Sequence, residues 1–189
     1  MFNQLPQTDL LSVWGTKFCD MKKVILFALL LVTACNKNDE SWYWGEVSAF
    51  KNGDCWTAEI YAGYNKPYSQ GIDIIVDRFN EKGFHREGIF IYKVPEQVGR
   101  YKLEHTEVRE FDGLVGSKYY KSIDDGDVAG GTYTLLLNDS ISDFVEITEI
   151  DGREIRGNFQ MSFVNNNSIP PDTIVFLDGK FHTRLVDLE

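Results

Sequence analysis

The chain has 189 residues, of which 43% are hydrophobic and 25% charged, a composition typical of one globular domain rather than of a disordered or fibrous protein. Three cysteines are too few for a disulfide framework. The net charge of −10 argues against a nucleic-acid partner, because phosphate binding needs clustered Lys and Arg.

Residues 21–34 have the layout of a secretory signal. Two lysines follow Met21, and residues 24–32 are an uninterrupted apolar run. This run is too short to span a ~30 Å hydrocarbon core as a helix, so it does not predict a transmembrane segment. A basic start, an apolar centre and a small residue before the cleavage point predict an export signal. The alternative to an export signal is a buried apolar helix at residues 24–32. Residues 1–20 look like an upstream extension, so Met1 and Met21 are alternative start residues.

The sequence Leu-Val-Thr-Ala-Cys, which ends at Cys35, resembles the bacterial lipobox. In lipoproteins with this motif the signal is removed just before the Cys, whose thiol and new amine carry acyl chains such as palmitate. The resemblance implies that residues 1–34 are removed, that Cys35 is lipidated, and that residues 35–45 form a tether to the membrane. The Lys and acids after Cys35 also resemble the surface-export signal of Bacteroidota-type lipoproteins, or form a plain solvated tether. We expect a protein anchored to the outer membrane, on its periplasmic or its surface side.

Beyond the tether, residues 46–189 show the two-residue period of strands and predict a single β domain. No stretch of a dozen residues has the three-to-four-residue apolar spacing of an amphipathic helix. Turn residues recur every 8 to 15 positions, as at Asn52-Gly53, Lys82-Gly83 and Asp151-Gly152. The pattern predicts an all-β, antiparallel fold of roughly 8–10 strands, either a β-sandwich or a partly closed barrel. The expected strands include residues 72–77, 87–94, 99–103, 131–135, 144–148, 154–163 and 172–181.

One hairpin allows a register to be predicted. A two-residue loop at Asp151-Gly152 would place Ile147 opposite a polar residue. A three-residue loop of residues 150–152, with Gly152 in the left-handed region, instead places Ile147 opposite Ile155 and Glu146 opposite Arg156. The match of apolar with apolar residues favours the three-residue loop.

Four short motifs resemble those of small Bacteroidota lipoprotein domains of unknown function. They are A-x-x-N-G-x-x-W-x-A at residues 49–58, G-x-Y-x-L at 99–103, I-x-G-x-F at 155–159 and D-G-x-F at 178–181. The resemblance covers most of residues 47–181. It implies an all-β lipoprotein fold and supplies no catalytic residues.

The sequence offers no pattern that predicts catalysis, a cofactor or a metal. His85, His105 and His182 lack ligand spacing, and the acids at residues 124–127 lack the spacing of an EF-hand loop. Cys55 has no neighbouring base and is expected to be buried and inert. Gly116-Ser117 does not form G-x-S-x-G. We therefore expect a non-enzymatic protein, with a hydrolase as the weakest alternative.

Four aromatic residues, Trp42, Trp44, Tyr119 and Tyr120, are candidates for ligand contact. Such side chains stabilise sheets by cross-strand packing, and they also form stacking platforms for sugars or partner proteins. Two functions follow. The first is a binding or accessory module for a glycan, peptide or protein, and the second is a lipocalin-like barrel that carries a small apolar ligand. A packed interior favours the first and a large cavity the second.

Overall fold

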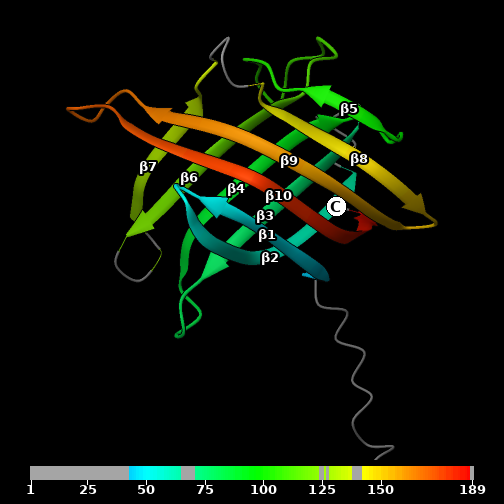
Figure 1. Cartoon of the computed structure of the whole chain (residues 1–189), viewed down its shortest axis with the longest axis horizontal. Coiled ribbons are helices and arrows are strands. Elements are labelled where there is room, and N and C mark those ends of the chain that lie inside the picture. The colour runs from blue at the N-terminus through cyan, green and yellow to red at the C-terminus, as the bar shows by residue number, and fades with distance from the viewer. Residues whose placement is uncertain (1–42, 65–70, 124–125, 127, 138–141, 188–189) are drawn as a thin grey trace, which may run out of the picture. The chain divides into compact units, whose positions relative to one another are not determined.

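The computed structural model describes residues 43–64, 71–123, 126, 128–137 and 142–187. Within these ranges the chain forms ten strands, which confirms the expected all-β fold and strand number. No helix in this described part is long and apolar enough to cross a membrane. The strands, shown in Figure 1, are β1 (Gly45–Lys51), β2 (Asp54–Tyr64), β3 (Ile72–Phe79), β4 (His85–Val94), β5 (Gly99–Lys102), β6 (Gly116–Ile123), β7 (Val128–Leu135), β8 (Phe144–Asp151), β9 (Glu154–Asn165) and β10 (Asp172–Asp187).

A ring of 8 strands forms a partly closed barrel. The strands follow one another in the order β1, β2, β3, β4, β6, β7, β9 and β10, and β10 pairs again with β1. Every pair around this ring is antiparallel. The end of β10 also pairs in parallel with β2, so the sheet is mixed rather than purely antiparallel as expected. The joint between β7 and β9 is the shortest, because it consists of Thr134 opposite Val164 and Leu135 opposite Phe163. The partly closed barrel is thus the correct alternative, and the sandwich is not observed.

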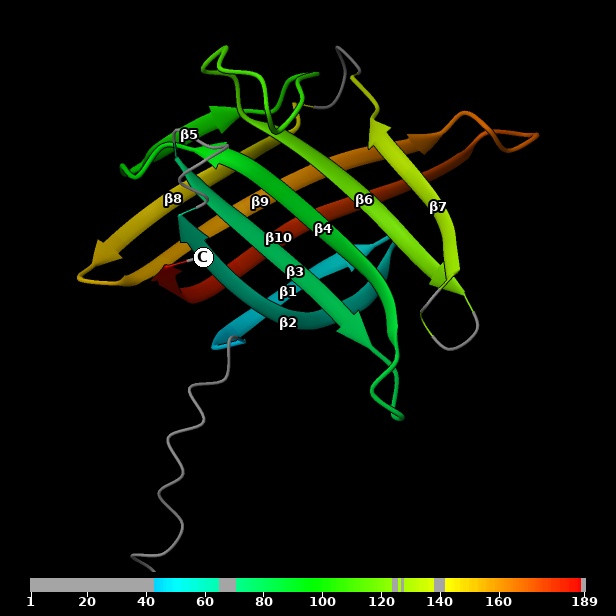
Figure 2. The ribbon, with the colours of Figure 1, turned by 180° about the vertical axis from the view of Figure 1, so that it is seen from behind.

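The wall of the barrel forks along β9. Residues 154–160 of β9 pair with β8, whereas Phe163 and Val164 pair with β7. In Figure 2, β8 and β7 accordingly lie towards opposite ends of β9. Strand β5 adds to the outer edge of β8, and a parallel bridge between Leu103 and Val115 joins the end of β5 to the start of β6. Strands β8 and β5 therefore extend the sheet along the part of β9 that does not pair with β7.

Aromatic side chains fill the middle of the barrel. Trp56 of β2 meets Phe176 of β10 with ring centroids 5.0 Å apart. Tyr119 of β6 lies 5.7 Å from Phe176 and 5.8 Å from Phe163 of β9. All four side chains are at most 2% exposed. Burying a side chain of this size stabilises the fold by about 1.5–3 kcal/mol. These four aromatic side chains therefore connect opposite walls of the barrel through one packed core.

Two glycines on β9 and β10 are each covered by a phenylalanine of the other strand. Gly157 pairs with Phe181, and Gly179 pairs with Phe159. A Cβ atom at Gly157 would lie 2.1 Å from the Glu146 carbonyl oxygen and 2.4 Å from the Phe181 ring, and one at Gly179 would lie 2.6 Å from the Phe159 ring. The two phenylalanines are nearly fully buried. Each ring thus occupies the space that the missing side chain leaves, which fixes the register of the two strands.

The hairpin between β8 and β9 differs from the expected one. Asp151 pairs with Glu154, so the loop is the two-residue turn Gly152-Arg153, and Ile147 lies opposite Gly157 rather than Ile155. The predicted pairing of Glu146 with Arg156 is also wrong, because the pairing shifts between Ile147 and Glu149. This bulge at residue 148 keeps Ile147 on the buried face although the loop is one residue shorter than expected. Gly152 has φ of +58°, as expected, and as the first residue of the turn it matches a type II′ hairpin.

Gly152 provides a test of this turn. A Cβ atom at this position would meet nothing within 4 Å, so the cost of a substitution comes from the backbone alone. We expect Gly152→Val to lower the free energy of unfolding by about 1–2 kcal/mol, and Gly152→Asn to lower it less, since Asn tolerates positive φ. Urea denaturation measures both. Equal shifts below about 0.5 kcal/mol, typical of ordinary surface positions, would contradict the assigned turn.

Candidate functional site

The aromatic candidates do not form one surface. Tyr119 is fully buried in the core, whereas Tyr120 is half-buried on the outer face of β6. Trp44 is half-buried, with its ring 5.2 Å from the ring of His182 and 4.5 Å from the guanidinium of Arg184. Trp42 lies outside the described residues. A single stacking platform made of these side chains is therefore not supported.

The remaining residues singled out from the sequence are placed as follows. Cys55 is exposed, so the expectation that it is buried is wrong. Its side chain points outward from β2, whereas that of the next residue, Trp56, points into the barrel. The acids at residues 124, 125 and 127 lie outside the described residues. Within the described ranges, no group of three His, Cys, Asp or Glu side chains is arranged to hold a metal ion.

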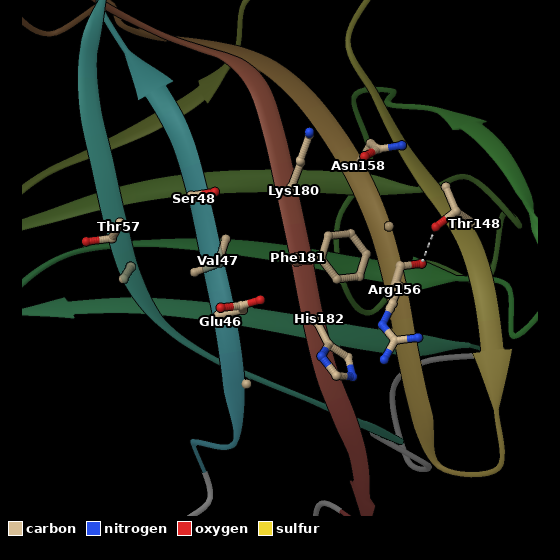
Figure 3. Close-up of a pocket in the computed structure, with 13 residues that line it drawn as sticks. Glu46, Val47, Ser48, Thr57, Thr148, Arg156, Asn158, Lys180, Phe181 and His182 are labelled. Carbon is tan, nitrogen blue, oxygen red and sulfur yellow. Dashed lines mark hydrogen bonds between the residues drawn. The ribbon is translucent and has the colours of Figure 1, made fainter.

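A groove of about 550 Å³ lies across strands β2, β1, β10, β9 and β8 (Figure 3). Its floor includes the buried residues Val47, Gly157 and Phe181. The strand register brings one row of polar side chains across all five strands, because residues opposite one another share a face. In order across the sheet this row is Thr57, Ser48, Lys180, Asn158 and Glu146.

A second row runs beside the first. Glu46 of β1 lies opposite His182 of β10, which lies opposite Arg156 of β9, which lies opposite Glu149 of β8. The Arg156 guanidinium donates to the Glu149 carboxylate over 2.8 Å. His182 contacts Glu154 at 3.0 Å. We call the outward side chains of the two rows the groove face.

Two charged side chains of the groove face have no assigned partner. Among the described residues, no hydrogen bond or ion pair engages the exposed carboxylate of Glu46 or the exposed ammonium of Lys180. By contrast, Asn158 donates to Glu146 over 3.1 Å, and the Thr148 hydroxyl donates to the carbonyl of Arg156 over 3.1 Å. The middle of the groove thus offers one free acceptor group and one free donor group, while its β8 side is already satisfied.

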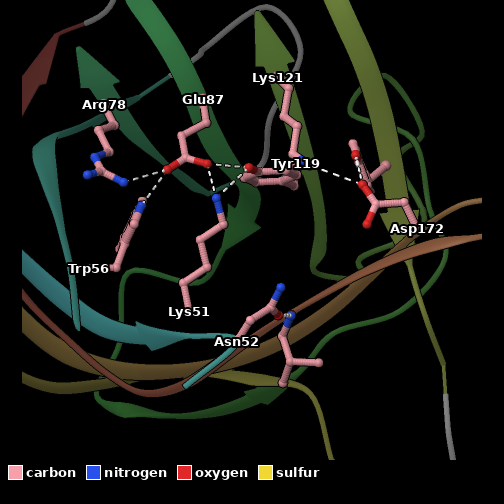
Figure 4. A network of polar contacts seen from close by, with 10 residues as sticks. Lys51, Asn52, Trp56, Arg78, Glu87, Tyr119, Lys121 and Asp172 are labelled. Carbon is pink, nitrogen blue, oxygen red and sulfur yellow. Dashed lines mark hydrogen bonds and ion pairs between the residues drawn. The ribbon is translucent and has the colours of Figure 1, made fainter. Parts of the chain in front are cut away.

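A second polar system lies inside one end of the barrel and is centred on Glu87 of β4 (Figure 4). Its side chain is 8% exposed. Trp56 donates to the carboxylate over 2.8 Å and Arg78 over 3.1 Å, and Lys51 and Tyr119 also donate to it. These donors come from β2, β3, β1 and β6. Four donors meet two oxygens, so the carboxylate is fully satisfied and joins five strands rather than waiting for a ligand.

The contacts of Glu87 shift two pKa values in opposite directions. Burial raises the pKa of the Glu87 carboxyl, but hydrogen bonds from Lys51, Tyr119 and Trp56 outweigh it and lower the pKa to about 2. Burial and the hydrogen bond to Glu87 raise the pKa of the Tyr119 hydroxyl far above its ordinary value. Glu87 is therefore ionised and Tyr119 protonated throughout the physiological range.

A neighbouring cluster connects β6 and β7 to β10, whose Asp172 lies opposite Asn165 of β9. Lys121 of β6 donates to Asp172 of β10 over 3.0 Å, and the Tyr133 hydroxyl of β7 donates to the same carboxylate. The Lys121 ammonium also lies 4.9 Å from the centre of the Tyr133 ring. Hydrogen bonds from Tyr133 and Lys121 lower the pKa of Asp172. These contacts connect β6 and β7 to the start of β10.

Lys93 organises the loop between β5 and β6. Its side chain is 4% exposed, and its ammonium donates to the Thr106 hydroxyl over 2.6 Å and to the Asp112 carboxylate over 2.7 Å. It also donates to the carbonyls of Glu107 and Glu110, each over 3.0 Å. Lys93 has φ of +64°, an unusual value for a residue with a side chain. Its donors are all used within the loop, which indicates a structural role.

Asp143 is a buried carboxyl beside the fork of β9. It lies next to Ser162, but neither carboxylate oxygen makes a hydrogen bond of ordinary geometry. Burial raises its pKa to about 6, partly offset by the nearby Ser162. A raised carboxyl pKa favours the folded state below about pH 4, and this contribution is lost as the pH rises through 6. Asp143 and Glu87 therefore give stability opposite dependences on pH.

Comparison with known proteins identifies no relative: no family model matches this chain, and neither a curated protein nor a solved structure does.

The Glu87 network predicts a measurable loss of stability. Glu87→Gln leaves Lys51 and Arg78 without their carboxylate, and we expect the free energy of unfolding to fall by about 3 kcal/mol at pH 7. Because the folded-state pKa near 2 lies below the ordinary 4.5, this contribution is present above about pH 5 and is lost as the pH falls towards 2. The difference between wild type and variant should therefore shrink across that window.

Urea denaturation at about pH 7, 5 and 3 measures this difference, and the effect of Asp143 cancels because both proteins contain it. Glu81→Gln, on the exposed β3–β4 turn, is the control and should change stability by less than about 0.5 kcal/mol. A wild-type-to-Glu87→Gln difference that stays constant from pH 7 to 3 would contradict the assignment.

Proposed function

We propose that this chain is an exported lipoprotein, anchored to the outer membrane through Cys35, whose β domain binds an oligosaccharide on the groove face. The anchor is supported by the basic residues after Met21, the apolar run at residues 24–32 and the lipobox-like sequence that ends at Cys35. These residues lie outside the described part of the chain, so the support for the anchor comes from sequence alone. The motifs that resemble those of Bacteroidota lipoprotein domains are consistent with such an anchor.

The observation that carries the binding proposal is the open groove with the free carboxylate of Glu46 and the free ammonium of Lys180. Sugar hydroxyls both donate and accept hydrogen bonds, so they suit a surface that mixes the two kinds of group. Ser48, Thr57 and Asn158 add further donors and acceptors in the same row. A strongly charged ligand would instead meet both signs of charge.

Strand pairing also favours a sugar over a peptide. Strands β1, β10 and β9 each have a neighbour on both sides in the groove, so their backbone groups are engaged in the sheet. A peptide that binds by adding a strand needs a free edge. The groove offers side chains instead, which is how polyhydroxylated ligands are recognised.

The packed interior of the barrel favours a binding site on the groove face over the alternative of a lipocalin-like carrier. Trp56, Tyr119, Phe163 and Phe176 contact one another across the middle of the barrel. A lipocalin-like carrier needs that space for its ligand. We therefore propose binding on the outer wall and not within the barrel.

Glycan-array binding by the full-length protein in detergent micelles tests the groove. Lys180→Glu should weaken binding at least about tenfold, equivalent to about 1.4 kcal/mol, because it replaces the free donor by a second carboxylate beside Glu46. Lys82→Glu, on the β3–β4 turn outside the groove, makes the same change in charge and should bind as wild type does. Equal affinities for the two variants would rule out the groove.

Metabolic labelling with a palmitate analogue tests the anchor. Cys35→Ala should abolish the label, because the lipobox-like sequence then lacks the thiol that accepts the lipid. Cys55→Ala is the matched control and should be labelled as strongly as wild type. Full labelling of the Cys35→Ala protein would refute lipidation at this residue.

A further inference from the structure

Three polar side chains from three strands meet in a line on the outer wall, away from the groove. The Ser122 hydroxyl of β6 lies 2.8 Å from Nδ1 of His85 in β4. Nε2 of the same ring lies 3.2 Å from Oδ1 of Asp77 in β3. The His85 side chain is 20% exposed and that of Asp77 is 9% exposed. The sequence did not predict this arrangement, because the three residues are far apart and belong to no catalytic motif.

An irregularity in β4 brings these side chains together. Arg78 pairs with Glu87, but the next residue, Phe79, pairs with His85, so Arg86 is an extra residue on β4. This bulge turns His85 to the outer face, where Asp77 lies. Ser122 follows the regular alternation of β6 and shares the outer face with Tyr120, and the shift beside it leaves Gly130 of β7 as the extra residue. Bulges commonly redirect side chains next to active sites.

The surroundings of Asp77 fix which ring nitrogen carries the proton. A carboxylate can only accept, so Nε2 of His85 donates to Asp77, and Nδ1 remains an acceptor for the Ser122 hydroxyl. The Tyr43 hydroxyl donates to Asp77 over 2.7 Å and the Tyr120 hydroxyl over 2.5 Å. Burial and these hydrogen bonds raise the pKa of both tyrosines well above the ordinary value, which keeps them as donors.

Two aromatic rings hold the imidazole in place. Tyr120 stacks on His85 with centroids 5.1 Å apart and an interplanar angle of 14°. Phe79 meets the ring edge-on at 5.7 Å. The imidazole is thus oriented by a carboxylate at one nitrogen and by rings at its face and edge. These are the features of a general base positioned beside a hydroxyl nucleophile.

We propose that Ser122 is a nucleophile that accepts acyl groups from esters, with His85 as its base and Asp77 as the residue that positions His85. The Ser122 oxygen adds to the ester carbonyl carbon while Nδ1 of His85 takes the hydroxyl proton. The bond to the alcohol oxygen then breaks, and His85 returns the proton to that oxygen. Water releases the acyl group from Ser122 by the same route and yields a carboxylic acid.

The neighbouring surface indicates the kind of ester. A hollow of about 700 Å³ adjoins His85 through Phe79 and is also lined by Phe84, Arg78 and Arg86. Phenylalanine rings suit an apolar acyl group. The two guanidinium groups, of which that of Arg78 also donates to Glu87, suit an acidic group on the same molecule. We therefore assign the substrate class as esters that combine an apolar acyl chain with an anionic group. This site is separate from the groove face and does not depend on it.

A fluorophosphonate probe tests the nucleophile in the full-length protein. Attack by the Ser122 oxygen forms a phosphorus–oxygen bond and expels fluoride, so mass spectrometry of the peptides locates the label. We expect label on Ser122 and none on that peptide in Ser122→Ala. His85→Gln should slow labelling on the order of 100-fold, the usual contribution of a general base. Ser168→Ala, a loop serine bonded to the Asn165 carbonyl, is the control and should react as wild type does.

The role of Asp77 is separated from a merely structural one by the kinetics of inactivation. Asp77→Asn should lower the maximal rate of labelling and leave the half-saturating probe concentration unchanged, because the probe does not touch Asp77. Melting curves report folding of each variant. Wild-type labelling spread over several serines, or an undiminished rate in folded His85→Gln, would overturn the proposal. If His85→Gln does not fold, hydrolysis of an activated anionic ester by Ser122→Ala at the wild-type rate overturns it instead.

Discussion

The pairing of β9 with β10 is the constraint on which the rest of this fold depends. It is the longest ladder in the sheet and runs from Asp172 opposite Asn165 to Arg184 opposite Glu154. Phe159 over Gly179 and Phe181 over Gly157 lock its register, because each ring needs the space that a side chain would fill. Strand β9 then divides between β8 and β7, and β10 closes the ring against β1. A slip of one residue would turn every buried side chain of β9 to the outside.

The same register builds the groove. Lys180 and Asn158 are neighbours on the outer face because Gly179 and Phe159 are neighbours on the inner face. The hairpin of β1 and β2 is attached by Asn52, whose backbone N–H donates to the Val175 carbonyl over 2.9 Å and whose side chain accepts from the Val175 N–H over 2.8 Å. Ligand-facing side chains thus sit on strands whose positions are fixed from within.

The sequence predicted the fold class, the number of strands and which side chains of β9 point inward. The two-residue alternation along a strand does not depend on the lengths or types of the turns. It did not predict the hairpin register, because one bulge at residue 148 compensates for a shorter loop without exposing any apolar residue. Glu87 could have been found: it falls in the same phase as the inward Ile89 and Ile91, and an acid in that phase requires buried donors. The Ser122, His85 and Asp77 cluster could not, because it depends on the bulge in β4 and on which strands are adjacent.

Three of the short motifs also gain a physical explanation. I-x-G-x-F and D-G-x-F supply the two halves of the interlocking pair between β9 and β10. In A-x-x-N-G-x-x-W-x-A, Asn52 and Gly53 have φ of +50° and +92°, as the two-residue hairpin turn requires, and Trp56 reaches Glu87. The motifs therefore describe packing and turns, which is why they carry information about fold and none about catalysis.

A double-mutant cycle on Gly179 and Phe159 tests the central claim most directly. A Cβ atom at Gly179 would meet its three nearest atoms in the Phe159 ring, so the two residues should be strongly coupled. We predict that Gly179→Ala and Phe159→Ala each lower the free energy of unfolding by more than about 2 kcal/mol, and that the double variant loses at least about 1 kcal/mol less than their sum. Effects that add within about 0.5 kcal/mol would show that the ring does not need the glycine, and would contradict this account of the register.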